Sequence, residues 1–539
     1  MKFATTTRTT TTLAVLLGVV VAAGVHQATA TALLRGDKTD EDDSPCHSAA
    51  NKDSCFATTD DNGMTCEWCE CSAIPSECLT ADEAKLAPEG VFDCSSPSRT
   101  KLDFITLVGD PVKDDFCDVN SKSGYMSIDQ SAYDQNGEGK NLFYWQFDKR
   151  GTSEEDDDDT TPFIIWLTGG PGCSSSLALL TENGPCSVTP DGTGTQLNPY
   201  SWTEVANVLW LDQPAGVGFS FGEESDTNEQ MISEDAYWFV QKFMDTYPQY
   251  AKQPLYIVGE SYGGHYAPAI AHRIWLGNKK LEDGAQTLNL AGVAVGNGLT
   301  APQEQYKWYP EMAFNNSHGI QVISEDEYNT MKAVVPNCVK LIEECNNGDG
   351  VINKFACQSA FYVCNLGLTS PYQATGLNPY DIREQCKVPP LCYDFSFVTK
   401  FMNSASTKEA LHVNTKKSHS WASCNMGINL KFHVDWMKDF SPYIADLLND
   451  DIPALIYAGD VDYICNYLGN KAWSYQLTWS GGDEFRAAPE HDWKDGSGLA
   501  RTANGLTFLQ VYDAGHMVPS DKPEVALDMI RTFVSGGEF

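Results

Sequence analysis

A serine flanked by glycines, between a strand-like and a helix-like run, constrains the fold of this 539-residue chain more than any other feature. The motif is Gly259-Glu-Ser-Tyr-Gly263. The run 254–258 before it is rich in β-branched and aromatic residues and predicts a buried strand, and 264–275 has helical spacing. In this context the motif predicts a nucleophile elbow, where small neighbours let the backbone turn sharply and expose the serine hydroxyl. The pentapeptide alone is weak, because Gly-rich turns often contain serine, but its flanks favour a catalytic Ser261.

A serine nucleophile needs a base, and the base needs an acid that orients it. In α/β-hydrolases the acid and then the histidine follow the serine along the chain, each on a loop after a strand. The run 452–458 predicts a strand that leads to Asp460 and Asp462. Spacing does not decide between the two carboxylates, because both closely follow the same strand.

Three histidines compete for the role of base. His516 follows the run 506–512, which predicts another strand. His491 lies in a polar stretch with no predicted strand before it. His265 is too close to Ser261 in sequence to return as its base, and a hydrogen bond to backbone is the simpler expectation. His516 is therefore the predicted base.

Six motifs follow one another along the chain: WLTGGPGCSS (166–175), LDQPAGVGFS (211–220), GESYGGH (259–265), GNGL (296–299), YAGDVDYIC (457–465) and GHMVP (515–519). Together they resemble the successive motifs of the serine carboxypeptidase family, above all its carboxypeptidase Y-like members. The resemblance extends from about residue 124 to 537 and implies an α/β-hydrolase fold. It also implies a triad of Ser261, Asp462 and His516, which selects Asp462 over Asp460.

The other patterns fit a central, mostly parallel sheet. Buried strands are predicted at 162–167, 208–211 and 290–295. The run 233–247 predicts an amphipathic helix, and 124–128 and 141–147 alternate like half-exposed strands of an antiparallel edge. From about residue 300 the regular alternation ends, and the resemblance implies an inserted, disulfide-bonded cap.

The expected domain organisation has five parts. They are a signal peptide (1–30), a Cys-rich N-terminal module or propeptide (31–115), the first part of the core (116–300), the cap (301–436) and the second part of the core (437–539). The signal is indicated by early basic residues, an apolar run at 13–23 and small residues at 28–30. No stretch is long and apolar enough for a permanent membrane anchor. We therefore expect a soluble secretory protein, either extracellular or in an acidic, vacuole- or lysosome-like compartment.

The composition excludes some classes of binding partner and indicates the cellular compartment. A net charge of −37 argues against nucleic acid and anionic membrane surfaces, which both require basic patches. The 18 cysteines fit an oxidising compartment. The acidic run 154–159 predicts a solvated loop. Family members are often monomers or homodimers, and the same is expected here.

The N-terminal module differs in kind from the rest of the chain. Its cysteines are Cys46, Cys55, Cys66, Cys69, Cys71, Cys78 and Cys94. With few aliphatic residues it cannot bury a large core, so disulfides are expected to stabilise it. A zinc site at Cys66, Cys69 and Cys71 is the less favoured alternative. The pattern faintly resembles plexin-semaphorin-integrin modules, and the run 100–108 predicts a linking strand.

The resemblance also implies four disulfides in the hydrolase part. The pairs are Cys173–Cys424, Cys338–Cys364, Cys345–Cys357 and Cys386–Cys392. Cys465 lies where relatives keep an unpaired thiol at the site. If it is free, one of Cys117, Cys186 or the N-terminal cysteines is also free, or pairs between molecules. Asn315 begins the single N-glycosylation sequon found, Asn-Asn-Ser.

The glycines of Thr168-Gly-Gly-Pro-Gly172 let backbone amides approach a substrate, as an oxyanion hole requires. By resemblance the oxyanion donors are the amides of Gly170 and Tyr262. The residues that the resemblance assigns to substrate binding are Thr168, Gly169, Glu182, Glu260, Cys465 and Met517. Thr168 departs from the family's usual asparagine, which weakens the inference of ordinary exopeptidase activity.

The resemblance implies that protonated Glu182 and Glu260 donate hydrogen bonds to the substrate's C-terminal carboxylate. Two close, buried carboxyl groups raise each other's pKa, so activity should be greatest in weak acid. The expected function is a serine carboxypeptidase that acts on C-termini of peptides and proteins without metal or cofactor. The alternatives are an acyltransferase or esterase on the same scaffold, and a secreted binding protein that uses the Cys-rich module.

Overall fold

The computed structural model describes residues 116–117, 119–134, 139–151, 159–347 and 350–539, with Cys55 and the strands β1 (Glu67–Glu70), β2 (Glu77–Leu79) and β3 (Asp93–Ser95). The chain divides into two compact units, 1–102 and 103–539. In the first unit β1 to β3 form an antiparallel sheet in the order β2-β1-β3. The predicted signal peptide, the predicted strand 100–108 and most of the acidic run 154–159 lie outside the described residues.

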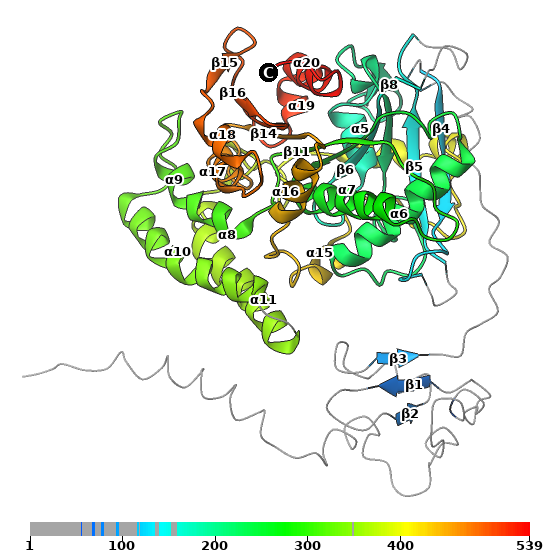
Figure 1. Cartoon of the computed structure of the whole chain (residues 1–539), viewed down its shortest axis with the longest axis horizontal. Helices are drawn as coiled ribbons and strands as arrows, with labels where there is room; N and C mark the ends of the chain where they lie inside the picture. The colour runs from blue at the N-terminus through cyan, green and yellow to red at the C-terminus, as the bar shows by residue number, and fades with distance from the viewer. Residues whose placement is uncertain are drawn as a thin grey trace, which may run out of the picture. The chain divides into compact units, whose positions relative to one another are not determined.

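The second unit is built on one ten-stranded sheet (Figure 1). Its strands are β4 (Ser121–Ser127), β5 (Asn141–Phe147), β6 (Phe163–Thr168), β9 (Asn207–Leu211), β10 (Leu255–Glu260), β11 (Leu290–Gly296), β14 (Ala454–Gly459), β15 (His491–Trp493), β16 (Gly498–Ala503) and β17 (Leu506–Val511). Their spatial order is β15-β16-β17-β14-β11-β10-β6-β9-β5-β4. The central strands from β17 to β9 are parallel, and the two strands at each end are antiparallel. The predicted α/β fold with a mostly parallel sheet is confirmed.

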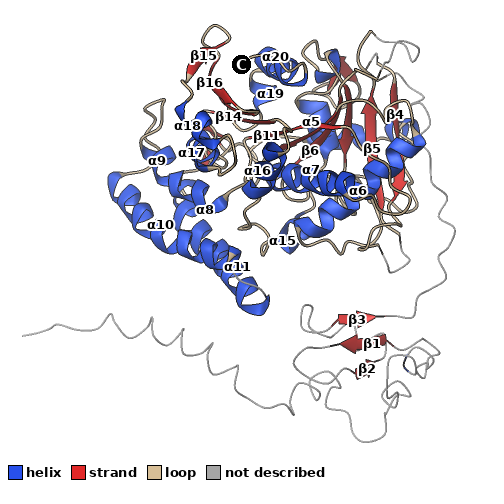
Figure 2. Ribbon diagram, in the orientation of Figure 1, coloured by secondary structure: helices blue, strands red, loops and turns tan. Residues whose placement is uncertain are grey.

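Helices cover both faces of the sheet (Figure 2). Those of the core are α5 (Ser175–Thr181), α6 (Glu229–Thr246), α7 (Gly263–Lys279), α16 (Ser441–Asn449), α17 (Tyr467–Gln476), α18 (Gly482–Ala487), α19 (Val518–Asp521) and α20 (Pro523–Val534). Alternate side chains of β6 face opposite sides. Ile165 packs in the core with α6 and α7, and Trp166 packs in the core with α5 and α20. This alternation follows from the two-residue period of a strand.

The prediction that β4 and β5 are half-exposed was wrong. Every residue of β5 is buried, as are all but the first of β4. The physical reason is that both faces are covered. Helix α6 packs on one face. The segment after α14 crosses the other face, where Ser123 Oγ donates to the Leu411 carbonyl (3.0 Å) and the Tyr125 and Ser418 hydroxyls bond at 2.8 Å.

The region expected to be the cap is largely helical. Its helices are α8 (Pro302–Gln305), α9 (Tyr309–Phe314), α10 (Glu325–Asn346), α11 (Gly350–Cys364), α12 (Ser370–Gln373), α13 (Ser396–Met402), α14 (Ala405–Ala410) and α15 (Met426–Lys431), with a π-helical turn η4 (Asn365–Thr369) after α11. A capping box of Ser324 and Glu327 begins α10. Two disulfides, Cys338–Cys364 and Cys345–Cys357, join α10 to α11.

Shorter elements complete the described part of the chain. They are the strands β7 (Cys186–Val188), β8 (Thr195–Leu197), β12 (Leu377–Asn378) and β13 (Asp381–Gln385), and the 3₁₀ turns η2 (Trp202–Glu204) and η3 (Tyr306–Trp308). Within the described residues, no helix combines the length and apolar character needed to span a bilayer.

Candidate active site

The predicted elbow is present where β10 meets α7. Ser261 has a φ of +63°, a left-handed conformation that a residue with a Cβ rarely adopts. The turn is crowded, because a Cβ on Gly259 would lie 2.3 Å from the Gly263 carbonyl oxygen, and one on Gly263 would lie 2.7 Å from that of Leu167. The Ser261 carbonyl accepts hydrogen bonds from the amides of Gly264 and Leu299, both at 2.9 Å. These contacts hold the strained backbone in place.

The sheet brings the two expected partners together from separate loops. Asp462 follows β14, and His516 follows the neighbouring strand β17. Asp462 Oδ2 lies 2.8 Å from His516 Nδ1, and both residues are buried. Asp460 instead accepts a hydrogen bond from the Asp513 amide (2.8 Å) and pairs with His318 (3.0 Å). Of the two carboxylates that spacing left open, geometry therefore selects Asp462.

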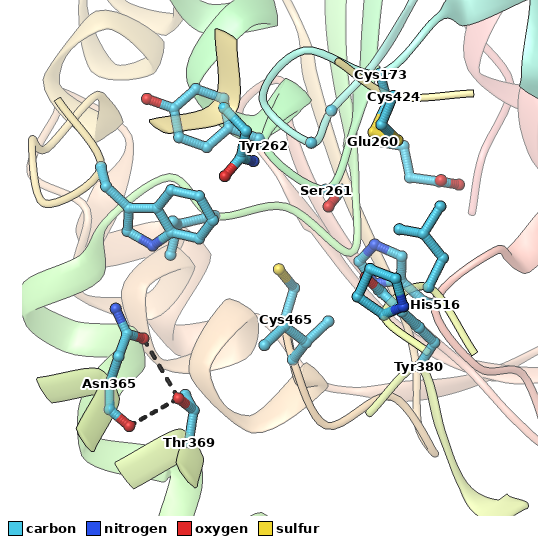
Figure 3. A pocket seen from close by; sticks show the side chains of 18 of the residues that line it. Cys173, Glu260, Ser261, Tyr262, Asn365, Thr369, Tyr380, Cys424, Cys465 and His516 are labelled. Carbon is cyan, nitrogen blue, oxygen red and sulfur yellow. Dashed lines mark hydrogen bonds between the residues drawn. A yellow bond between two sulfur atoms is a disulfide. The ribbon is translucent and has the colours of Figure 1, made fainter. Parts of the chain in front are cut away.

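Ser261 and His516 line the same cavity, and Figure 3 shows their side chains directed toward it. Among the described residues no hydrogen bond joins them. Such serine–histidine bonds are often long before substrate binds. The His516 amide donates to the Tyr380 carbonyl (2.9 Å), and the ring centroids of the two residues are 5.0 Å apart. These contacts restrain the histidine loop beside the serine.

Asn297 is a site residue for which the sequence assigned no role. Its Nδ2 donates to Asp462 Oδ2 at 2.9 Å, and its Oδ1 accepts the Gly459 amide at 3.0 Å. The amides of Ile464 and Cys465 also donate to the Asp462 carboxylate, at 3.1 and 3.2 Å. Four hydrogen-bonding groups thus surround the Asp462 carboxyl group when His516 is included. The GNGL motif marked this position, but only the fold shows what it touches.

Two backbone segments approach each other closely beside the serine. Gly170 has a φ of +110°, which favours glycine, and it precedes a cis peptide bond to Pro171. A Cβ on Gly169 would lie 2.3 Å from the Tyr262 nitrogen, so the two segments approach closely only because residue 169 is glycine. Tyr262 is the N-cap of α7, whose dipole favours negative charge at this end. The Cys173–Cys424 disulfide anchors the loop.

Two carboxyl groups lie together at the same cavity. Glu182 ends α5, Glu260 precedes Ser261, and both are buried and hydrogen-bonded to each other. Burial raises the pKa of Glu182 to about 7. Burial, and then the neighbouring Glu182 charge, raises the pKa of Glu260 well above its usual value. One oxygen of each carboxyl has no partner among the described residues, so this pair can hold protons and donate hydrogen bonds to an anion.

Thr168 lies beside the carboxyl pair. Its Oγ1 accepts a hydrogen bond from Trp166 Nε1 at 2.9 Å, and its amide donates to Ser175 Oγ at 3.1 Å. The hydroxyl proton of Thr168 therefore remains available to a ligand in the cavity. A donor persists at this position although the side chain differs from the family's asparagine.

The cavity has a volume of about 480 Å³ and a largely apolar wall. Gly169, Gly170, Cys465 and Met517 line it. The Cys465 thiol is unpaired, and burial raises its pKa well above the usual range. Sequence reasoning missed the aromatic and polar wall of Tyr306, Tyr309, Phe361, Asn365, Thr369, Tyr380 and Trp436. These residues come from scattered parts of the cap, where no local pattern marks them.

The two histidines that the sequence did not favour have other hydrogen-bond partners. His265 is fully buried, and its Nδ1 bonds to the Leu299 carbonyl at 2.5 Å. Burial lowers its pKa to about 4, so the ring is neutral at physiological pH. His491 begins the edge strand β15 and bonds to the Phe539 carbonyl. Backbone hydrogen bonding of His265 is what the sequence suggested.

The disulfides include all four pairs that the resemblance implied. A fifth, Cys117–Cys186, joins the start of the hydrolase part to β7. Cys465 is free and Cys55 is disulfide-bonded. Of 18 cysteines, these five pairs and Cys465 leave seven, all in the N-terminal module. Cys117 and Cys186, two of the candidates for a second free cysteine, are thus paired with each other.

Comparisons with known proteins agree with this geometry. The family profile of serine carboxypeptidases matches residues 111–536. The chain is 40% identical over 426 residues to carboxypeptidase Y homolog A of Phaeosphaeria nodorum (78% of this chain, 74% of the relative), and 40% identical over 424 residues to carboxypeptidase Y of Candida albicans (78% and 74%). A crystal structure of Kex1(delta)p, a prohormone-processing carboxypeptidase from Saccharomyces cerevisiae, superposes with a TM-score of 0.68 at 28% identity, covering 79% of this chain and 93% of that one. The chain belongs to the serine carboxypeptidase family.

Proposed function

We propose that the carboxypeptidase activity of this chain proceeds through an acyl-enzyme on Ser261. His516 takes the proton of the Ser261 hydroxyl as Oγ attacks the last peptide carbonyl. His516 then gives that proton to the departing amino group, and the peptide bond breaks. Water attacks the ester in the same way and regenerates the serine. Asp462, held by Asn297 and backbone amides, keeps the imidazole oriented and stabilises its charged form.

The oxyanion formed in each step is assigned to the amides of Gly170 and Tyr262. Support for this comes from the glycine-dependent approach of residue 169 to the Tyr262 amide and from the position of that amide at the start of α7. Donors fixed before the reaction stabilise developing charge without reorganisation. In comparable hydrolases one such donor lowers the activation free energy by roughly 3–4 kcal/mol.

The observation that carries exopeptidase specificity is the buried Glu182–Glu260 pair beside Ser261. Among the described residues that line the cavity there is no Lys and no Arg to pair with a substrate carboxylate. We assign carboxylate recognition to hydrogen bonds from the protonated pair and from the Thr168 hydroxyl. Substrate binding should therefore be strong below the pKa of Glu182, about 7, and weaken as pH rises through it.

The test is release of the C-terminal amino acid from a blocked dipeptide between pH 4 and 8, with the corresponding C-terminal amide as control. For the dipeptide with a free C-terminal carboxylate, we expect kcat/KM to fall above neutral pH because KM rises. The KM of the C-terminal amide should not rise in this way. Glu182→Gln should shift or remove the KM dependence. Fluorophosphonate labelling of Ser261 without amino acid release at any pH would refute exopeptidase specificity.

Thr168 supports one alternative, an acyltransferase or esterase, because the departure from asparagine lies in the carboxylate site. Acyl transfer to a small alcohol that outcompetes water would identify it. A binding protein with an inactive hydrolase body is the other alternative. The intact arrangement of Asp462 and His516 beside Ser261 opposes it, and absence of fluorophosphonate labelling would revive it.

We assign the protein to the secretory pathway, in an acidic or extracellular setting. Support comes from the sequence features of residues 1–30, the five disulfides and an exposed Asn315 in its sequon. We also assign residues 31–115 to a separate Cys-rich module, 116–300 and 437–539 to the core, and 301–436 to the cap. C-termini of peptides or proteins are the proposed substrates, and the assembly is proposed to be a monomer or homodimer.

A further inference from the structure

A buried carboxylate lies directly behind the nucleophile elbow and belongs to none of the steps above. It is Asp435, which precedes the cavity residue Trp436. Asp435 Oδ2 accepts a hydrogen bond from the Tyr262 hydroxyl at 3.3 Å and another from the Glu229 amide at 3.2 Å. One oxygen thus joins the end of the cap, the residue after the nucleophile, and the first residue of α6.

Glu229 adds a second carboxyl group in the same interior. The residue is only 1% exposed, and both oxygens of its side chain lack a hydrogen-bond partner. Its acidic neighbours are Asp435 and Asp226, and Lys140 is engaged by Asp226 and Asp235. An ionised Glu229 would be a buried charge without donors beside a like charge, which is strongly unfavourable. Glu229 is therefore neutral in the folded protein.

We propose that Asp435 acts as a positioning residue that holds Tyr262 so that its amide stays directed at the oxyanion, with Glu229 as the neutral carboxyl group beside it. The ring of Tyr262 stacks on His265 and contacts Trp436, with centroids 4.4 and 5.4 Å apart. Loss of the hydroxyl contact would free this ring. The oxyanion donor would then lose its fixed position.

The surroundings of Glu229 and Asp435 favour the neutral form of both carboxyl groups in weak acid. Burial raises the pKa of Asp435 to about 7 and that of Glu229 well above its usual value of 4.5. The Asp435 charge adds to the shift of Glu229, and Lys438 opposes that of Asp435. The other titratable and charged groups facing the pair are Asp226, Lys140, Tyr262, His265, Tyr266 and Tyr443. Of these, His265 is neutral because burial lowers its pKa.

This inference rests on the proposed role of Tyr262 in catalysis, and it makes a kinetic prediction different from that of Glu182. The Glu182–Glu260 pair acts on substrate binding, whereas Asp435 acts on the reacting geometry. Removing the Tyr262–Asp435 bond should therefore lower kcat and leave KM nearly unchanged, also with a C-terminal amide substrate. The rate of fluorophosphonate labelling should fall with kcat, because the phosphonyl oxygen occupies the same hole.

The first experiment is a double-mutant cycle of Tyr262→Phe and Asp435→Asn. At pH 8, above the Asp435 pKa of about 7, each single variant should lower kcat and the labelling rate by about tenfold, the size expected for a hydrogen bond to a charged group. The double variant should be no slower than either single variant. Unchanged rates, or a double variant as slow as the product of the two effects, would overturn the proposal. The labelling rate measures the reactivity of Ser261 even if the protein releases no C-terminal amino acid. The experiment can therefore refute the role of Asp435 independently of the proposed exopeptidase specificity.

The second experiment measures stability against pH with Glu229→Gln, and uses Glu325→Gln, the exposed first residue of α10, as control. A raised pKa in the folded state means that stability is lost as pH rises above 4.5 toward the folded value. Relative to Glu229→Gln, the unfolding equilibrium constant of the wild type should grow by up to about tenfold per pH unit between pH 5 and 7. The control should parallel the wild type. Parallel curves for Glu229→Gln and the wild type would refute a neutral Glu229.

Discussion

Asn297 Nδ2 donates to Asp462 Oδ2 at 2.9 Å, and that oxygen also accepts His516 Nδ1 at 2.8 Å. Asn297 has a φ of +40°, a conformation that asparagine tolerates better than most residues. Asn297 therefore holds the carboxyl group that we propose as the acid of the triad.

Asn297→Gly keeps the left-handed backbone and removes both side-chain hydrogen bonds. We expect kcat to fall by about 10- to 100-fold, since a hydrogen bond to a charged group contributes roughly 1.5–3 kcal/mol. KM should change little, because Asn297 does not line the cavity. Steady-state kinetics on a blocked dipeptide would measure both. The control is Asn504→Gly, at another asparagine with positive φ (+47°), which is exposed and should leave kcat unchanged. A wild-type kcat in Asn297→Gly would show that the Asn297 side chain does not contribute to catalysis through Asp462.

Thr168→Val retains the shape of the side chain and removes its hydroxyl. KM for a free C-terminal acid should rise by about tenfold while KM for the C-terminal amide stays constant, because only the acid uses this donor. The variant also leaves the buried Trp166 Nε1 without its acceptor, so the free energy of unfolding should fall by about 1–3 kcal/mol. Equal KM changes for acid and amide would mean that Thr168 does not recognise the carboxylate. Thr168→Asn, which restores the family's residue, should lower KM for the acid.

The positive φ of Ser261 predicts that the nucleophile destabilises the fold. Ser261→Gly and Ser261→Ala should both be inactive, but the glycine variant should be more stable by about 1 kcal/mol, because a Cβ in the left-handed region is strained. Thermal unfolding of both variants tests this. At Ser406, in helix α14, the order should reverse and alanine should be the more stable. The same order at both positions would show that the elbow stores no such strain.

Cys465 predicts a specific inhibition. Its thiol lines the cavity, and its amide donates to Asp462, so a mercurial bound there should block the site. Burial, followed by the Asp462 and Glu260 charges, raises the pKa of the thiol, so iodoacetamide should react slowly at neutral pH. Activity assays with each reagent test this, and Cys465→Ser should resist the mercurial. Full activity with mercury bound at Cys465 would contradict the placement of this thiol at the site.

The sequence predicted strands correctly where a short run of apolar residues marked them. The predicted strand at 254–258 corresponds to β10, the strand at 452–458 to β14 and the strand at 506–512 to β17, each with small differences at the ends. Buried parallel strands read as apolar runs whatever their partners are. The exposure of β4 and β5 could not be predicted in this way, since a remote segment covers them.

The sequence by itself determined the parallel core, the elbow around Ser261 and the positions of His516 and the two candidate acids, because short-range patterns encode them. Only the tertiary structure decided that Asp462 reaches His516, that Asn297 supports it, and that the Glu229 amide and the Tyr262 hydroxyl both donate to Asp435. These contacts join residues far apart in the chain. Their distances depend on strand order and on packing of the cap, which no local spacing contains.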